Sequence, residues 1–353
     1  MIKKILCFLL ALCICSPVFS SCSKEEDDSD YLFGEGLVAV KIDGKWGYCD
    51  KEGYLRIKAI YDDASAFSCG LACVGIDGKY GYIDSKGETV VDLKFDGGRL
   101  FSEDRACVSQ NGKYKYIDKS GEFITDTEFD YGLDFSEGLA CVKIGEYFGY
   151  INKNGKMTID AKYAAAMPFS HGLACVKESS DGRCGYINKK GKIALEFVYD
   201  EAGVFNNGLA RVVLQQNLCY IDTSGTIIVA PGNTNADYFY EGLARVVNED
   251  DLFGYMDKSG NTVIDCKYVY AGPFSNGLAL AFDGKTVGYI DKNGNYVIQS
   301  QYDLLYSDSS AGFDFSDDGY VIVVKDTGFG VIDKNGNEIL PCIYQGINGF
   351  TSY

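Results

Sequence analysis

The sequence predicts an all-β fold, a tandem array of about nine three-stranded repeats stacked as an open β-solenoid-like structure. The first observation is a unit led by phenylalanine that recurs about every 34 residues, as the step from Phe67 to Phe101 shows. The second is a pair of tight-turn signals in every unit, which leaves little room for a helix. The copies start near Phe33, Phe67, Phe101, Phe135, Phe169, Phe205, Phe239, Phe274 and Phe315.

Each unit carries three short strand signals. Residues 71–74 are short and β-compatible, and the Asp77–Gly78 pair that follows favours a hairpin turn because glycine tolerates positive φ. A second run at 80–84 ends in an Asx-x-x-Gly turn, and residues 89–91 form the third strand. An alanine-containing connection then leads to the next phenylalanine. One unit cannot enclose its own apolar face, so neighbouring copies must share a core.

The glycine of the Asx-x-x-Gly turn is present in every copy. Its spacing after an Asp or Asn predicts a left-handed backbone conformation that only glycine adopts without strain. The nine positions are Gly53, Gly87, Gly121, Gly155, Gly191, Gly225, Gly260, Gly294 and Gly336.

The chain resembles the WG-repeat (KWG-repeat) family. The segment Gly44-Lys45-Trp46-Gly47-Tyr48 carries the family motif, and the resemblance covers about Tyr31 to Tyr344. Later copies replace the tryptophan, and two replace the glycine after it, with Lys115 and Cys219. The residues at the tryptophan position are Tyr80, Tyr114, Phe148, Cys184, Leu218, Phe253, Val287 and Phe329. The resemblance implies a repeat fold but leaves tryptophan-dependent contacts without support in these copies.

A closed β-propeller is the alternative architecture. Propellers typically use four-stranded blades of about 40 residues or more in rings of roughly 4 to 8. Three strands in a shorter unit, repeated about nine times, therefore favour the open array.

The amino terminus predicts a lipoprotein. Residues 1–21 have two lysines, an apolar stretch and small residues before Cys22, as in a signal peptide. The Phe19-Ser20-Ser21-Cys22 ending resembles a bacterial lipobox, which implies lipidation of Cys22. Residues 22–32 form an acidic tether, which resembles the surface-export signal of Bacteroidota lipoproteins, and residues 33–353 form the repeat array. We expect the protein to be anchored to the outer membrane, at the cell surface. Ordinary secretory cleavage and periplasmic retention are the alternatives.

Charge and cysteine usage narrow the classes of partner. The formal net charge of −17 disfavours nucleic acid and anionic lipid headgroups.

Cys73, Cys107, Cys141 and Cys175 share one repeat position, which Arg211 and Arg245 occupy in later copies. We expect free thiols packed as small apolar groups, with disulfides across neighbouring repeats as the alternative.

The sequence offers little chemistry for catalysis. The one histidine, His171, occupies a turn position that other copies fill with Glu or Asn. The regular Asp series becomes Asn152 and Asn188 in two copies, which indicates turn formation, because Asn cannot act as an acid or base. We therefore expect no enzyme, no cofactor and no metal.

A tyrosine series at another repeat position has two interpretations. It is expected to be a buried ladder with hydrogen-bonded hydroxyls, and the alternative is an exposed platform for sugars or peptide side chains. Its members are Tyr48, Tyr82, Tyr116, Tyr150, Tyr186, Tyr220, Tyr255 and Tyr289.

The predicted function is a non-catalytic scaffold that binds a protein or peptide partner. A glycan-binding protein is the alternative, and a hydrolase is a weaker one. Specific recognition is expected where the repeat breaks, at 230–235 and 307–314, and at the single tryptophan. The candidate binding residues are Trp46, Asn233, Asn235, Asp308 and Asp314.

Overall fold

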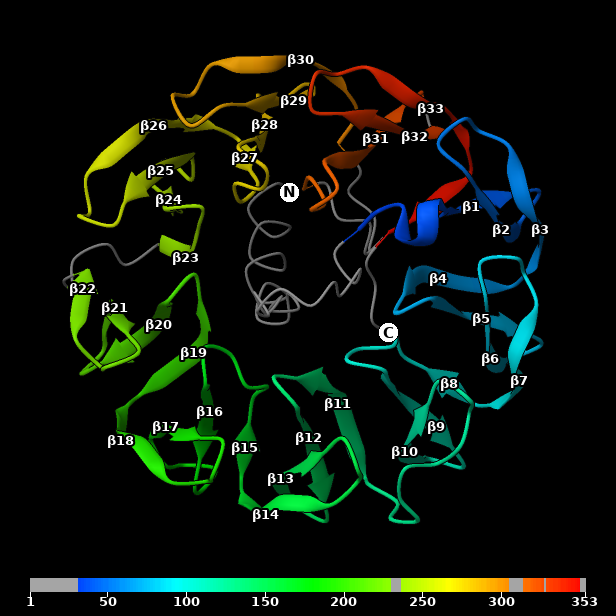
Figure 1. Ribbon diagram of the computed structural model, residues 1–353. Helices are drawn as coiled ribbons and strands as arrows, with labels where there is room; N and C mark the ends of the chain where they lie inside the picture. Colours follow the sequence, from blue (N-terminus) through cyan, green and yellow to red (C-terminus); the bar gives the residue numbers. More distant parts are fainter. Residues whose placement is uncertain (1–30, 230–235, 305–313, 327, 350–353) are drawn as a thin grey trace.

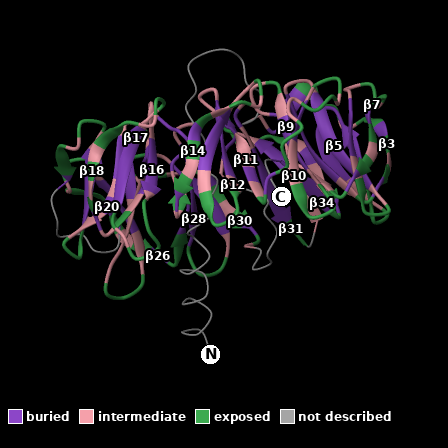
Figure 2. Cartoon of the chain, turned by 90° about the horizontal axis from the view of Figure 1, so that it is seen from below, coloured by how far each residue is buried: buried purple, intermediate pink, exposed green. Residues whose placement is uncertain are grey.

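A computed structural model describes residues 31–229, 236–304, 314–326 and 328–349. The strands of this part form nine antiparallel sheets that follow one another around a central axis (Figure 1). The ring is a closed β-propeller of nine blades, and the innermost strands form what we call the inner wall. Figure 2 shows the ring from the side, with buried residues concentrated in the strands and exposed residues in the turns and along the outermost strands.

The strands run outward from the axis within each blade. After the short 3-10 turn η3 (Gly34–Gly36), blade 1 contains β34 (Gly346–Asn348), β1 (Val38–Ile42), β2 (Lys45–Cys49) and β3 (Leu55–Tyr61). Blade 2 contains β4 (Asp63–Ser68), β5 (Leu71–Ile76), β6 (Lys79–Ile83) and β7 (Thr89–Phe95), and blade 3 contains β8 (Gly97–Gly98), β9 (Arg105–Gln110) and β10 (Lys113–Asp118). Blade 4 contains β11 (Tyr131–Ser136), β12 (Leu139–Ile144), β13 (Tyr147–Asn152) and β14 (Met157–Tyr163), and blade 5 contains β15 (Ala165–Ala166), β16 (Leu173–Lys177), β17 (Cys184–Asn188) and β18 (Ile193–Tyr199).

The second half of the ring has the same order. Blade 6 contains β19 (Glu201–Asn206), β20 (Leu209–Leu214), β21 (Asn217–Asp222) and β22 (Ile227–Val229), and blade 7 contains β23 (Ala236–Tyr240), β24 (Leu243–Val247), β25 (Phe253–Asp257) and β26 (Thr262–Tyr268). Blade 8 contains β27 (Tyr270–Ala271), β28 (Ala279–Phe282), β29 (Val287–Ile290) and β30 (Tyr296–Tyr302). Blade 9 contains β31 (Tyr320–Lys325), β32 (Gly328–Asp333) and β33 (Glu338–Tyr344).

The open solenoid of three-stranded units was wrong. In blades 2 to 8 the connection before the second-strand run forms a further strand, such as β4, whose Phe67 pairs with Ala72 of β5. Strand β4 reads Asp-Ala-Ser-Ala-Phe-Ser and has no β-branched residue, so the segment lacked the residue types that usually mark a strand. A fourth strand gives each unit the composition of a propeller blade.

The ends of the described chain close the ring in blade 1. Strand β34 pairs antiparallel with β1, and Ala39 lies opposite Asn348. The Asn348 side chain donates a hydrogen bond of 2.7 Å from Nδ2 to the Ala64 carbonyl of blade 2. Blade 1 therefore takes its inner strand from the opposite end of the described chain. An open array has no such pairing between its ends.

The motif glycine decides how the outermost strand packs. A Cβ added to Gly81 would lie 2.4 Å from the Val91 carbonyl oxygen of β7, closer than any side chain permits. Blade 3 has Lys115 at this position, and its outer segment makes only isolated bridges, at Phe123 and Phe129. Blade 6 has Cys219 at this position and keeps the short outer strand β22, so only the longer Lys115 goes with the three-stranded sheet of blade 3.

The tyrosine series forms the core between blades, as predicted. Tyr82 is fully buried, its ring lies 4.8 Å from that of Phe101, and its hydroxyl donates to the Arg99 carbonyl of the next blade at 2.8 Å. Burial raises the pKa of this phenol well above its usual range. The exposed aromatic platform was therefore wrong, since the whole series is buried, from Tyr48 to Tyr289.

The turn predictions are confirmed. The nine turn glycines have φ between 71° and 84°. Asp84 Oδ1 accepts backbone hydrogen bonds from Lys86 and Glu88, and Asn152 Oδ1 accepts the equivalent pair. The regular carboxylates are therefore occupied by turn hydrogen bonds.

Candidate functional site

The inner wall is where the blades differ most from one another. Its side chains come from the innermost strands and from one position on the second strand, the position of the cysteine series. In blades 2 to 5 these places hold small or apolar residues, apart from a few polar ones that include Arg99 and Asp134. In blades 6 to 9 they hold Arg211, Asp237, Tyr238, Arg245 and Asp314.

The second-strand position supplies a donor to the next blade. The Cys73 thiol donates to the Gly98 carbonyl at 3.5 Å, and the Cys175 thiol donates to the Ala202 carbonyl at 3.3 Å. All ten described cysteines are free thiols, which confirms the expected state of the series. Burial raises the pKa of Cys73 to about 12, so this thiol stays protonated and inert at neutral pH.

Arg245 fills the same position in blade 7. Its Nη1 donates to the Ala271 carbonyl of blade 8 at 2.7 Å, and its Nη2 forms an ion pair with Asp237 of β23. Its guanidinium lies 5.5 Å from the ring centroid of Phe253 and 5.6 Å from that of Tyr270. The arginine side chain is 12% exposed, so this is a charge held in the wall by a carboxylate and two aromatic rings.

Asp314 lies beside this pair, against blade 8. A Cβ added to Gly272 would lie 2.7 Å from its Oδ1, so the glycine makes room for the carboxylate. Burial raises the pKa of Asp314 to about 6, and the positive charge of Arg245 opposes the shift. Burial likewise raises the pKa of the nearby Tyr240 phenol, with the charges of Asp237 and Asp314 adding to it. Near neutral pH this cluster can therefore exchange a proton.

Tyr238 extends the cluster into blade 6. Its hydroxyl oxygen would lie 2.1 Å from a Cβ on Gly203, so the absence of a side chain there gives the phenol its place. Arg211 of β20 lies close to it and donates from Nε to the Ala236 carbonyl at 3.2 Å. Glycines at the same repeat position, Gly203 and Gly272, thus each accept a larger side chain from the following blade.

A second charged pair lies on the opposite side of the ring, between blades 3 and 4 (Figure 1). Arg99 Nη1 forms an ion pair of 3.2 Å with Asp134 Oδ2, and its Nη2 lies 3.5 Å from the Tyr131 hydroxyl. Among the described residues, Asp134 Oδ1 is the buried side-chain polar atom with no hydrogen-bond partner. Burial raises the pKa of Asp134, and Arg99 opposes the shift.

The predicted site residues have different outcomes. Asp314 belongs to the inner-wall cluster. Trp46 is partly buried, and its Cη2 would lie 3.2 Å from a Cβ on Gly346 of the closing strand, so its ring packs on the closure. The predicted residues Cys22, Asn233, Asn235 and Asp308 lie outside the described part of the chain.

Sequence reasoning missed Arg245 and Asp237. The signal was present, since arginine at a position otherwise held by cysteine, alanine or leucine adds a charge to a core position. The period identified that substitution, but only the fourth strand shows that the position faces Asp237 on the inner wall.

His171 and its equivalents connect neighbouring blades. Its Nε2 accepts a hydrogen bond of 3.1 Å from the Gly208 backbone of the next blade, and the Glu137 carboxylate accepts one of 2.9 Å from Gly172. Both residues have positive φ, near 55°. The histidine is therefore a turn residue, as predicted. Among the described residues, no group of His, Cys, Asp or Glu side chains is arranged to hold a metal ion.

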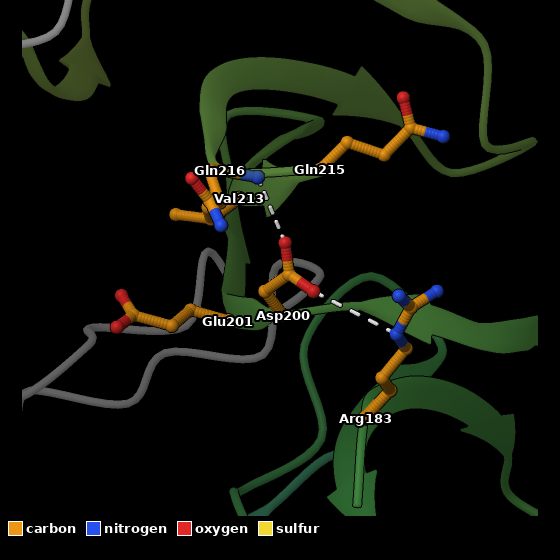
Figure 3. A pocket seen from close by; sticks show the side chains of 6 residues that line it. All are labelled: Arg183, Asp200, Glu201, Val213, Gln215 and Gln216. Carbon is orange, nitrogen blue, oxygen red and sulfur yellow. Dashed lines mark hydrogen bonds and ion pairs between the residues drawn. The ribbon is translucent and has the colours of Figure 1, made fainter.

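A shallow depression of about 630 Å³ lies between blades 5 and 6 (Figure 3). Asp200 in it accepts a backbone hydrogen bond of 2.9 Å from Gln216 and faces Arg183 Nε at 3.6 Å. The same contact recurs where Asp96 binds Lys79 and the Asn111 backbone. Because the depression is built from a contact repeated around the ring, it marks the scaffold and not a special site.

The family model described as "WG containing repeat" matches residues 46–80, 80–114, 116–147, 148–180, 185–217, 220–250, 253–284, 288–326 and 329–352. Comparison with curated proteins finds no match.

Solved structures resemble the fold. A crystal structure of the eukaryotic initiation factor aligns with a TM-score of 0.61 at 11% identity, over 89% of this chain and 98% of that chain. Hsv2 of Kluyveromyces lactis aligns with a TM-score of 0.41 at 10% identity, over 80% and 96% of the two chains. A streptogramin B lyase aligns with a TM-score of 0.35 at 12% identity, over 81% and 93%. The first supports the fold alone, and the two lower scores support no inference.

In the described part of the chain, no helix has the length and apolar composition needed to cross a bilayer.

Proposed function

The chain belongs to the family of WG-containing repeat proteins, and on that premise we propose that it is a surface lipoprotein whose propeller binds a protein or peptide partner without catalysis. Recognition takes place on the inner wall of blades 6 to 9. The partner contributes polar groups to the cluster of Asp237, Tyr240, Arg245 and Asp314.

One observation carries the proposal: blade 7 departs from the repeat pattern at several inner positions at once without losing structure. Blade 7 keeps all four strands, although its inner positions hold Asp237, Tyr240 and Arg245. At the equivalent positions other blades hold residues such as Gly203, Ser68 and Cys73. The scaffold thus forms without the charges, which each cost desolvation free energy in the wall. A binding role explains why they are there.

The proposed mode of attachment uses the amino terminus. Lipid on Cys22 holds the protein at the membrane, and the acidic segment after it separates the propeller from the bilayer. Metabolic labelling with a fatty-acid probe tests this, with Cys22→Ala as the control. Equal labelling of both forms, or of neither, refutes the anchor.

A regularised variant tests the partner-binding function. The triple change Asp237→Gly, Tyr240→Ser and Arg245→Cys gives each of the three positions a residue that other blades carry there. Envelope extract is passed over immobilised mature protein, and retained proteins are quantified by mass spectrometry. We expect at least a tenfold loss of the retained partner, with the thermal unfolding transition still cooperative.

The matched control changes three outward positions of the same blade, with Val263→Thr, Asp265→Asn and Lys267→Gln on β26. It should retain the partner like the wild type. Equal retention by the regularised variant would place binding elsewhere on the ring and overturn the proposal.

A further inference from the structure

Two equivalent arginines of the inner wall differ in one respect. Arg211 and Arg245 occupy the same repeat position in blades 6 and 7, and each donates to an inner-strand carbonyl of the next blade, Ala236 and Ala271. Arg245 also has an ion pair with Asp237. Among the described residues, no carboxylate forms an ion pair with Arg211, because blade 6 has Gly203 where blade 7 has Asp237.

A second donor occupies the place where a side chain on residue 203 would begin. Tyr238 reaches from blade 7 across Gly203, which has no side chain to block it. Burial raises the pKa of the Tyr238 phenol and the Arg211 charge opposes the shift, so the phenol keeps its proton at neutral pH and lies close to the guanidinium. A guanidinium and a phenol together offer several N–H and O–H donors to one acceptor group.

The sequence between β22 and β23 adds no acidic residue. Residues 230–235 read Ala-Pro-Gly-Asn-Thr-Asn and contain no acidic side chain. Among the described residues, Arg56, Arg99, Arg183 and Arg245 each form an ion pair with an aspartate, and Arg211 does not. Its open N–H groups therefore favour a carboxylate that binds from outside the blade.

We propose that Arg211 and Tyr238 form a carboxylate-binding site on the inner wall. The bound carboxylate faces Arg211 as Asp237 faces Arg245 one blade further on, and it accepts a further hydrogen bond from the Tyr238 hydroxyl. This inference rests on the proposed binding function of the same wall and names the group recognised. The carboxylate comes from an acidic side chain or chain end of the partner, or from the acidic residues between Glu25 and Asp30 of this chain.

The test is NMR of the full mature protein labelled with [15N]arginine. The sequence contains six arginines, so the Nε–Hε signals are few, and Arg211→Cys identifies one of them while restoring the residue of blades 2 to 5. The probe is the capped peptide acetyl-Gly-Glu-Gly-amide, with acetyl-Gly-Gln-Gly-amide as its uncharged match. We expect the glutamate probe to shift the Arg211 signal saturably and the glutamine probe to leave it in place.

Further variants distinguish the contributions of the two hydrogen-bond donors, Arg211 and Tyr238, and the two possible sources of the carboxylate. Tyr238→Phe, which removes one hydrogen bond, should weaken probe binding by about three- to tenfold. Neutralising the acidic segment (Glu25→Gln, Glu26→Gln, Asp27→Asn, Asp28→Asn and Asp30→Asn) moves the Arg211 signal, before any probe is added, only if that segment occupies the site. If the partner supplies the carboxylate, the signal stays and probe affinity is unchanged.

A glutamate probe that fails to shift Arg211 in both the parent and the neutralised form would overturn the carboxylate site, and so would equal shifts by the two probes. Failure of this inference is distinguishable from failure of the proposed function. If the glutamate probe does not shift the Arg211 signal and the blade 7 variant loses the partner, only the carboxylate site is refuted. If the probe shifts the Arg211 signal saturably and the blade 7 variant still retains the partner fully, the carboxylate site is supported and the proposed role of blade 7 is refuted.

Discussion

At the outer rim, blade 3 has Lys115 in place of the motif glycine and lacks a continuous outermost strand. On the inner wall, blade 7 carries Asp237, Tyr238 and Arg245 in place of smaller residues and keeps four strands. The rim glycine touches backbone, which cannot move without losing strand pairing. The wall residues replace side chains, which can be accommodated by a glycine in the neighbouring blade. At the rim, Lys115 goes with the loss of the regular outer strand, whereas the shorter Cys219 of blade 6 leaves β22 in place. On the inner wall, blade 7 takes its larger side chains without losing a strand.

The largest expected effect comes from replacing the motif glycine at the outer rim. Gly81→Ala places a Cβ 2.4 Å from the Val91 carbonyl oxygen, so β7 must detach or shift. We expect a loss of about 3 kcal/mol or more in the free energy of unfolding, measured by urea titration. Lys115→Ala in blade 3 should change it by less than about 1 kcal/mol, because no regular strand packs there. Similar losses in the two variants would contradict the role given to the glycine.

The second effect tests whether the wall charges are a compensated pair. Asp237→Ala leaves the Arg245 guanidinium in the wall without its carboxylate, and we expect a loss of about 2–3 kcal/mol. The double change Asp237→Gly and Arg245→Cys removes both charges and should recover most of this loss. A double variant as unstable as the single one would show that the charges also support the fold.

The third effect is a dependence of stability on pH. Burial raises the pKa of Asp314 to about 6 in the folded protein, against about 3.9 in an unfolded chain. The folded state therefore binds this proton more tightly, and the resulting stability is fully present below about pH 4 and is lost as pH rises through 6.

Asp314→Asn removes that dependence and should raise the free energy of unfolding at pH 7.5 by on the order of 2 kcal/mol. Unfolding in urea at pH 5 and pH 7.5 measures it, with Asp265→Asn on the outer strand as control. If both variants show the wild-type pH profile, Asp314 does not titrate in the wall.

The smallest effect concerns the contacts between regular blades. Glu137→Ala removes the acceptor of the Gly172 N–H and the ion pair with Lys189, at 3.1 Å. We expect a loss of about 1 kcal/mol, read from the shift of the thermal midpoint. His171→Glu should stay within about 0.5 kcal/mol of the wild type, since a carboxylate accepts the same backbone hydrogen bond in neighbouring blades. A larger effect of His171→Glu would show that the imidazole has a further role.

The sequence predicted what each unit contains better than how units meet. Turn positions such as Gly87 and Asp84, and the buried Tyr82, were correctly predicted because each depends on contacts within or next to one repeat. The strand at Ala64 was missed because it has none of the β-branched residues that usually mark a strand. Ring closure was missed because the pairing of Ala39 with Asn348 joins the two ends of the chain. Asp314 was found as a break in the repeat, but its proximity to Arg245 depends on how the inner positions of blades 7 to 9 meet, which a three-stranded unit does not describe.

The closing strand also sets an order of events. Ala39 and Asn348 are 309 positions apart (348 − 39), so the contact that completes blade 1 has one of the longest loops in the molecule to close. During synthesis, eight blades can form by adding to their neighbours while the first waits with an unpaired edge on β1. A chain that stops before Gly346 keeps that edge open to other strands, and we infer that such fragments aggregate or are degraded. The pairing of β34 with β1 can therefore form only after all nine blades have been synthesised.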